Sequence, residues 1–223
     1  MNIKKLKESG LNIFAAIEME KLPSEILDVF NAQNIKHSKN DTLCIIGSGG
    51  KKLWGKLNQP LDINQHPIDK YTVEQMKNFD PNVQIIFPHE TLNIPLQKIS
   101  RFLNISKESP LGIDIHKEFG LWFAFRGVFI TKIKISKNKN EDFISPCETC
   151  QSKDCITACP ANAISDSKYF FKLDLCNAHQ GIDKSSCENL CKARLACPYQ
   201  SIHQYEPEQT LYHIKSRKLI YHK

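Results

Sequence analysis

The sequence predicts an α+β protein in which a sheet covered by helices is followed by a smaller, loop-rich domain. Three observations support this prediction. Over residues 1–140, short apolar runs typical of buried strands alternate with stretches of helical period. Eight of the nine cysteines fall between Cys147 and Cys197, where cysteines take the place of a conventional apolar core. The lysine- and asparagine-rich stretch 136–142, which has few apolar residues, separates the two regions and is the expected domain boundary.

Each element of the larger domain has its own signal in the sequence. Ile26, Leu27 and Phe30 recur with helical spacing after Ser24, a residue type that caps helices. Residues 42–47 are an apolar run followed by a glycine-rich turn, which indicates a buried strand. The further expected elements are helices at 73–79 and 95–104, strands at 83–87, 111–116 and 121–134, and short helices near 155–159 and 188–195 in the cysteine-rich domain.

Composition excludes several classes of protein. The 223 residues are 41% hydrophobic, which is enough for a packed core. No apolar run in the sequence approaches the roughly 18 residues that a membrane span needs. The apolar stretch 11–17 runs into Glu18 without the small-residue cleavage site of a signal peptide. We therefore expect a cytoplasmic protein with no membrane partner.

The net charge of +6 is modest, and its clearest local excess lies near the C-terminus. After Glu208 the chain carries basic residues and no acid. The expected ferredoxin-sized domain over 141–205 would thus be followed by a basic tail over 206–223. We interpret this tail as solvated, with contact to an anionic partner, such as RNA or an acidic protein, as the alternative. Its basic residues are Lys215, Arg217, Lys218 and Lys223.

The clustered cysteines form two groups of four, and each group ends in Cys-Pro. From Cys147 the spacing is C-x2-C-x4-C-x3-C-P, and from Cys176 it is C-x10-C-x3-C-x5-C-P. In a cytoplasmic chain, where thiols stay reduced, such groups favour metal binding over disulfides. Zinc and iron–sulfur clusters both take four thiolates, so the residue types alone leave both open. Cys44, which stands alone in an apolar run, is interpreted as a buried small hydrophobe.

The two Cys-Pro endings resemble those of bacterial two-cluster ferredoxins. In those proteins each cubane takes three cysteines from one run and the fourth, before proline, from the other run. The gap of four residues between Cys150 and Cys155 is wider than in the usual ferredoxin run. The resemblance implies two [4Fe–4S] clusters, one held by Cys147, Cys150, Cys155 and Cys197 and the other by Cys159, Cys176, Cys187 and Cys191.

A second resemblance lies in the stretch 115–127, which reads Ile-His-Lys-Glu-Phe-Gly-Leu-Trp-Phe-Ala-Phe-Arg-Gly. It resembles a segment of the CblC family of cobalamin-processing proteins (methylmalonic aciduria and homocystinuria type C). This resemblance implies a nitroreductase-like domain over residues 1–140 that binds cobalamin and removes its upper axial ligand. The residues that match the family's segment, and that it implies for cofactor binding, are His116, Gly120, Trp122, Arg126 and Gly127.

The resemblance also bears on the chemistry of the expected pocket. Arg126 matches an arginine linked to glutathione binding in that family, whereas Asp114 stands where animal members have a cysteine. A flavin in the nitroreductase-like pocket is the alternative cofactor. Asp69 and Asp114 are candidate proton donors if they are buried beside the corrin, because desolvation raises the pKa of a carboxyl group.

Together these patterns indicate an iron–sulfur redox protein that takes electrons from an external donor and delivers them to a bound corrinoid, for removal of its upper axial ligand. The order of the domains also resembles that of epoxyqueuosine reductase, which implies tRNA as the alternative substrate. A cobalamin chaperone or an electron-transfer ferredoxin, neither of which turns over a substrate, is a third hypothesis. The sequence therefore leaves open whether the chain is an enzyme.

Overall fold

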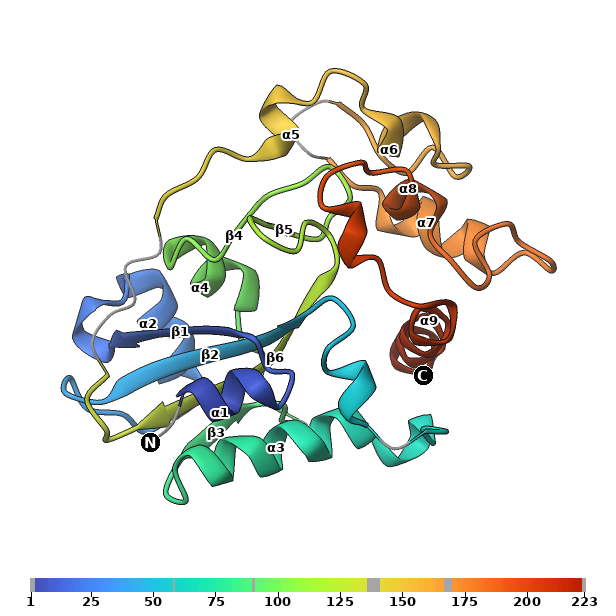
Figure 1. Ribbon diagram of the computed structural model, residues 1–223. Coiled ribbons are helices and arrows are strands. Elements are labelled where there is room, and N and C mark those ends of the chain that lie inside the picture. Colours follow the sequence, from blue (N-terminus) through green and yellow to red (C-terminus); the bar gives the residue numbers. More distant parts are fainter. Residues whose placement is uncertain (1–2, 58, 90, 136–140, 167–169, 222–223) are drawn as a thin grey trace. The chain divides into compact units, whose positions relative to one another are not determined.

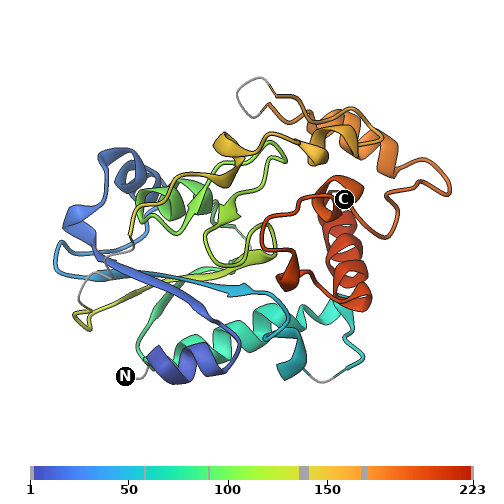
Figure 2. The ribbon, with the colours of Figure 1, turned by 45° about the horizontal axis from the view of Figure 1, so that its top comes forward.

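The computed structural model describes residues 3–57, 59–89, 91–135, 141–166 and 170–221 and divides the chain into two compact units (Figures 1 and 2). Unit 1 comprises Met1–Ile105 and Phe123–Asp142, and unit 2 comprises Ser106–Trp122 and Phe143–Lys223. This division differs from the expected single boundary near residue 140, because the stretch 106–122 belongs to the cysteine-rich unit. Most of the expected linker 136–142 lies outside the described residues.

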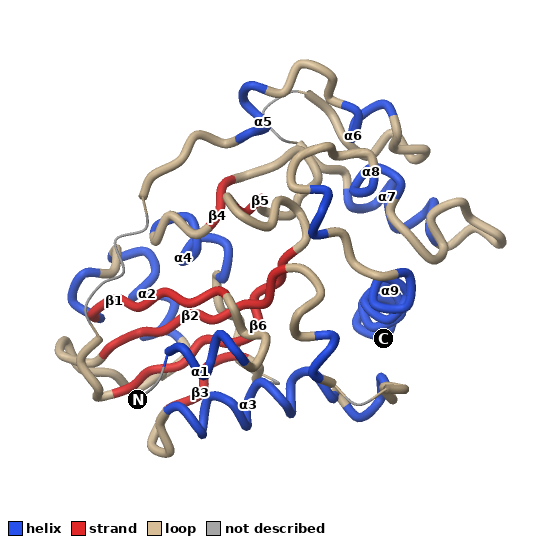
Figure 3. The backbone as a smooth tube through the Cα atoms, viewed as in Figure 1, coloured by secondary structure: helices blue, strands red, loops and turns tan. Residues whose placement is uncertain are grey.

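Unit 1 is a mixed helix–strand unit built on a four-stranded antiparallel sheet with the strand order β1-β2-β6-β3. Its strands are β1 (Ile13–Glu18), β2 (Thr42–Gly49), β3 (Gln84–Phe87) and β6 (Phe123–Thr131). Its helices are α1 (Ile3–Glu8), α2 (Ser24–Ala32), α3 (Pro67–Phe79) and α4 (Leu96–Phe102), with short 3₁₀ turns at Met19–Lys21, Trp54–Lys56 and Ile63–Gln65. Figures 1 and 3 show α1 and α3 on one face of the sheet and α2 and α4 on the other.

The core of unit 1 lies around the inner strand β2, in which every residue is buried. Helix α3 packs on the sheet through Phe79, whose ring centroid lies 5.9 Å from that of Phe14 and 5.6 Å from that of Phe129. The close approach of α3 also requires Gly127, since a Cβ atom there would lie 2.8 Å from Met76 Sδ. Apolar packing of this kind is the main stabilisation of such a unit.

Most of the elements predicted for unit 1 form near their expected positions. Helix α3 begins at Pro67 rather than at residue 73, because proline in the first turn lacks only an N–H group that has no helical partner there. The N-cap of α2 is Pro23 rather than the expected Ser24. Strand β1 was not expected, and it pairs with β2 from Ile13 opposite Gly47 onward.

Unit 2 contains short elements joined by long loops. Its strands are β4 (Ser106–Lys107) and β5 (Ile115–His116), and its helices are α5 (Pro146–Thr149), α6 (Asp154–Thr157), α7 (Leu173–Gln180), α8 (Lys192–Leu195) and α9 (Pro207–Tyr221), with a 3₁₀ turn at Ser201–His203. The strand expected at 111–116 pairs only over its last two residues. The expected basic tail is a helix over most of its length. No helix in the described part of the chain is long and apolar enough to cross a membrane.

The core of unit 2 joins the stretch 106–122 to the cysteine-bearing segments. Leu111, Ile115 and Leu121 from that stretch are buried with Cys159 and Ala193. Further buried members are Ala163 and Ile164. Five of the other clustered cysteines are partly buried and pack against this core, namely Cys147, Cys155, Cys176, Cys191 and Cys197. The cysteines therefore share one small apolar core with the stretch 106–122.

Candidate metal centres

Unit 2 contains two cavities of about 390 Å³, and four cysteines line each of them. In each cavity, three of the cysteines come from one sequence group and the fourth comes from the Cys-Pro ending of the other group. This is the interlaced arrangement that the ferredoxin resemblance implies. The first quartet is Cys147, Cys150, Cys155 and Cys197, and the second quartet is Cys159, Cys176, Cys187 and Cys191.

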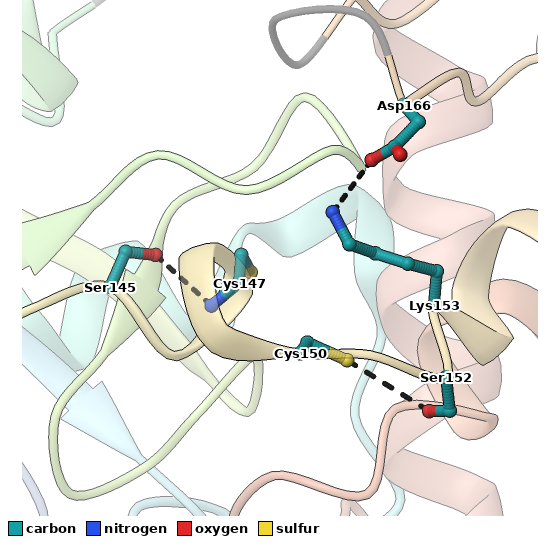
Figure 4. A network of polar contacts seen from close by, with 6 residues as sticks. All are labelled: Ser145, Cys147, Cys150, Ser152, Lys153 and Asp166. Atoms are coloured by element: carbon teal, nitrogen blue, oxygen red, sulfur yellow. Dashed lines mark hydrogen bonds and ion pairs between the residues drawn. The ribbon is translucent and has the colours of Figure 1, made fainter.

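The first cavity is formed largely by the loop that carries α5 and α6. Ser145 caps α5, and its Oγ accepts a hydrogen bond of 3.3 Å from the backbone N–H of Cys147. Cys150 Sγ lies 3.9 Å from Ser152 Oγ at the next turn. Lys153 Nζ lies 2.6 Å from Asp166 Oδ1 and pairs with it across the loop (Figure 4). Local polar contacts thus fix the backbone on which this quartet is mounted.

The second cavity is formed by α7, α8 and α9. Cys176 lies on α7, one turn before Gln180, whose Nε2 is 3.9 Å from the Cys176 sulfur. Cys191 is the N-cap residue of α8, and the backbone N–H of Arg194 donates a hydrogen bond to its sulfur. The side chain of Arg217 on α9 donates to the Cys176 sulfur and to Gln180 Oε1. Hydrogen-bond donors therefore reach two of the four sulfurs of this quartet, those of Cys176 and Cys191.

The electrostatic surroundings of the thiols depend mainly on burial. Burial is the largest cause that raises the pKa of the Cys147 thiol, to about 11, and the neighbouring sulfurs contribute to the rise. Such thiols stay protonated near neutral pH until a cation displaces the proton, since a metal binds the thiolate. Burial is likewise the first cause of the raised pKa values of Cys155, Cys176, Cys191 and Cys197.

The two quartets fit polynuclear clusters by their donor atoms and by the space that they enclose. A single zinc ion draws its thiolates to about 2.3 Å from the metal. Each quartet lines a cavity of about 390 Å³. Four sulfurs around such a space are the donor set of a [4Fe–4S] cluster.

The residues of the expected corrinoid motif fall into two groups, and the first group lies in unit 2. The side chain of Trp122 is fully buried, with its ring centroid 5.4 Å from that of Tyr205. Gly120 adopts a left-handed φ of +55°, and a Cβ atom there would lie 2.6 Å from the backbone oxygen of Tyr199. Both residues therefore fix the packing of the stretch 106–122 inside the cysteine-rich unit.

His116 closes a tight loop at the end of β5. Its backbone exchanges hydrogen bonds with Gly120, of 2.8 and 2.9 Å, and its Nδ1 accepts from the backbone N–H groups of Glu118 and Phe119 at 3.0 and 3.3 Å. Burial, with a smaller contribution from nearby His203, lowers the pKa of His116 to about 4. Protonation would also place a proton on Nδ1, which could then no longer accept the two backbone hydrogen bonds. The neutral ring is thus part of the folded loop.

Replacement of His116 by asparagine should remove a pH dependence of stability. The unfolded imidazole titrates near 6.5 and the folded one near 4, so the unfolded state binds more protons between these values. Stability from the neutral ring is therefore fully present above pH 6.5 and is lost as the pH falls toward 4, by about 3 kcal/mol at most. Thermal melting of both proteins from pH 7.5 to 5 measures this loss. Equal pH slopes for His116→Asn and wild type would contradict the assignment.

The second group of motif residues lies in unit 1. Arg126 Nε donates a hydrogen bond of 2.9 Å to Ser48 Oγ on the neighbouring strand β2. Burial raises the pKa of the Asp69 carboxyl, and the positive charge of Arg126 opposes that rise. Gly127 serves the close packing of α3. Asp114, the other candidate proton donor, is buried in unit 2, where it accepts a hydrogen bond of 2.5 Å from Ser106 Oγ.

Three of the five residues expected to bind a corrinoid are closely packed within the protein. Trp122 has no exposed surface to offer a cofactor, and Gly120 and Gly127 are occupied by close packing within different units. Of the five motif residues, His116 and Arg126 are partly exposed. The sequence analysis did not identify Arg194 or Arg217 as neighbours of the second quartet. It placed Arg217 in a solvated tail, and it found no signal at Arg194.

Comparisons with known proteins identify a similar fold but no family. No family model and no curated protein matches the chain. Among solved structures, the chain is similar to epoxyqueuosine reductase from Streptococcus thermophilus, with 15% sequence identity and a TM-score of 0.51. The match covers 89% of this chain and 65% of that protein, so the chain spans less than two thirds of its length. At this identity the likeness concerns the fold alone, and it gives no support to a CblC-like family.

Proposed function

We propose that the chain is an iron–sulfur oxidoreductase that carries two [4Fe–4S] clusters in unit 2 and supplies electrons to an epoxyqueuosine-reductase-like reaction on a tRNA nucleoside. The observation that carries this proposal is the pair of cysteine quartets, each around its own cavity. The fold likeness to epoxyqueuosine reductase supports the choice of substrate class. [4Fe–4S] clusters supply single electrons at potentials that their protein surroundings adjust.

The residues of unit 2 would hold the two clusters in sites that depend on one another. Because Cys159 and Cys197 cross between the sequence groups, neither half of the cysteine region can complete its quartet alone. Leu111 lines both cavities, so the two sites share an apolar wall. Backbone N–H groups donate to sulfur at both sites, from Tyr199 to Cys197 and from Arg194 to Cys191. Such donors stabilise the negative charge of a cluster.

The electron count suits this substrate class. Removal of an epoxide oxygen as water, with an alkene left behind, consumes two electrons and two protons. Two reduced clusters, which carry one electron each, supply these two electrons, and an external reductant then reduces the clusters again. Reductive removal of the upper ligand of cobalamin is the second candidate, and it ranks lower because the motif that suggested it serves packing at Gly120, Trp122 and Gly127.

Anaerobic assay of the iron-reconstituted protein tests the proposal. The protein is mixed with dithionite, cobalamin and tRNA that carries epoxyqueuosine, and the nucleosides are then identified by mass spectrometry. We expect queuosine to form with wild type and not with Cys159→Ser. Cyanide release from cyanocobalamin without any conversion of tRNA would favour the second candidate. If neither substrate reacts while both clusters are present and reducible, the chain is an electron carrier, and the proposed reaction is wrong.

A further inference from the structure

The two cavities differ in the charge of the side chains that line them. Lys153 and Asp154 line the first cavity, so their formal charges cancel. Arg194 and Arg217 line the second cavity, and among its described lining residues there is no acid. The second cavity therefore carries a local excess of two positive charges.

Arg217 acts directly on a sulfur of the second quartet. It reaches from α9 to Cys176, where its guanidinium both donates a hydrogen bond and lowers the pKa of the thiol against the larger effect of burial. Gln180 Oε1 accepts from the Nη2 of the same arginine and so holds the guanidinium at the sulfur. The arrangement gives helix α9 a specific attachment to the second quartet.

Arg194 is held beside the second cavity by a cage of aromatic rings. Its guanidinium carbon lies 4.5 Å from the centroid of the Trp122 ring and 4.8 Å from that of Tyr205. Its Nη2 donates a hydrogen bond of 2.5 Å to the backbone oxygen of Leu121. Its positive charge lowers the pKa of the Cys191 thiol, against the larger effect of burial. The cation is therefore held close to the cavity by the two rings and by this hydrogen bond.

The polar atoms of this cage have no partner that would neutralise the arginine. In the described residues, Arg194 Nε, Trp122 Nε1 and Tyr205 Oη are buried and accept or donate no hydrogen bond. A partly buried guanidinium without a carboxylate is stabilised when an anion lies nearby. The nearest group in the second cavity that gains negative charge on metal binding is the cysteine quartet. A metal-bound quartet would therefore supply the negative charge that offsets the charge of Arg194.

The charged side chains of the first cavity are arranged differently. The ammonium of Lys153 is paired with Asp166 at 2.6 Å, which offsets its charge. Asp154 raises the pKa of the Cys197 thiol through its negative charge. An acid beside a quartet disfavours the addition of an electron, whereas an arginine favours it.

We propose that Arg194 and Arg217 hold the second cluster at a higher reduction potential than the first, so that electrons collect on the second cluster. This inference rests on the proposed iron–sulfur function. Burial of Cys159 and Cys187 opposes the effect, since a buried cluster resists added negative charge. The same low dielectric strengthens the attraction of two nearby guanidinium groups, and this attraction outweighs the burial of two ligands.

Redox titration of the reconstituted holoprotein, followed by electron paramagnetic resonance, tests the inference. The transition that is lost in Cys187→Ser identifies the second cluster. We expect it at the higher potential in wild type, and in Arg217→Gln or Arg194→Gln we expect its reduction equilibrium to fall about tenfold, a shift of about 59 mV for one electron. The transition of the first cluster should stay in place. Lys215→Gln, an exposed change on the same helix, is the matched control and should shift neither transition.

Different results distinguish the inference from the function on which it rests. If wild type lacks two clusters by iron and sulfide content, the proposed function fails. If both clusters are present and neither arginine variant moves the second transition, or if the second cluster has the lower potential in wild type, the inference fails. If Arg217→Gln loses the second cluster altogether, Arg217→Lys decides, because a retained positive charge should keep the wild-type potential and a purely structural arginine should not tolerate the change.

Discussion

Replacement of Cys159 by serine should remove one whole cluster and lower the iron content from about eight to about four atoms per chain. Cys159 lies in the first sequence group but lines the second cavity. The cluster that is lost should therefore be the one that is also lost in Cys187→Ser, and the cluster of Cys155 should remain. Iron analysis and the electron paramagnetic resonance spectra of the three single variants measure this.

Cys44 provides the matched control for this experiment. It is fully buried in β2 of unit 1, and burial raises the pKa of its thiol, which favours an inert side chain. Cys44→Ala should keep about eight iron atoms per chain. If Cys159→Ser instead loses the same cluster as Cys155→Ser, each sequence group holds its own cluster, and the interlaced assignment is wrong.

Replacement of Gly120 by alanine should destabilise unit 2 by about 2–4 kcal/mol. Two costs add at this position. The backbone has φ of +55°, which an alanine adopts with strain, and the new Cβ would lie 2.6 Å from the backbone oxygen of Tyr199. Because Tyr199 also donates to the Cys197 sulfur, the variant should lose the first cluster more readily than the second. The melting temperature, measured by the visible absorbance of the clusters, should fall by roughly 10–20 °C.

Gly55 offers a control that isolates the effect of position. A Cβ atom at Gly55 would meet no heavy atom within 4 Å, so Gly55→Ala should leave the melting temperature nearly unchanged. Equal melting temperatures for Gly120→Ala and wild type would contradict the packing of the stretch 106–122 against the second cysteine group.

The parts of the fold that the sequence predicts well are those with a strong local signal. The helix at α2 shows the 3.6-residue period of Ile26 and Phe30, which face the core. The apolar run of β2 is bounded by a glycine-rich turn. Both features are encoded within a few neighbouring residues. The interlaced grouping of the cysteines stays a prediction, which the resemblance of the two Cys-Pro endings to those of ferredoxins implies.

The features that the sequence does not predict depend on contacts between distant segments. Helix α9 has almost no apolar stripe, and one of its attachments to unit 2 is the contact of Arg217 with Cys176 and Gln180. A polar attachment of this kind leaves no apolar period in the sequence, so the segment was predicted to be a basic tail. Trp122 and Gly120 match a ligand-binding motif in sequence, yet their packing against Tyr205 and Tyr199 uses residues some 80 positions away.

The central claim, two [4Fe–4S] clusters on two interlaced cysteine quartets, is tested most directly by the iron and acid-labile sulfide content of the anaerobically reconstituted chain. The account predicts about eight iron atoms and about eight sulfides per chain. Two zinc ions per chain with no acid-labile sulfide would contradict it, and would make the quartets structural metal sites.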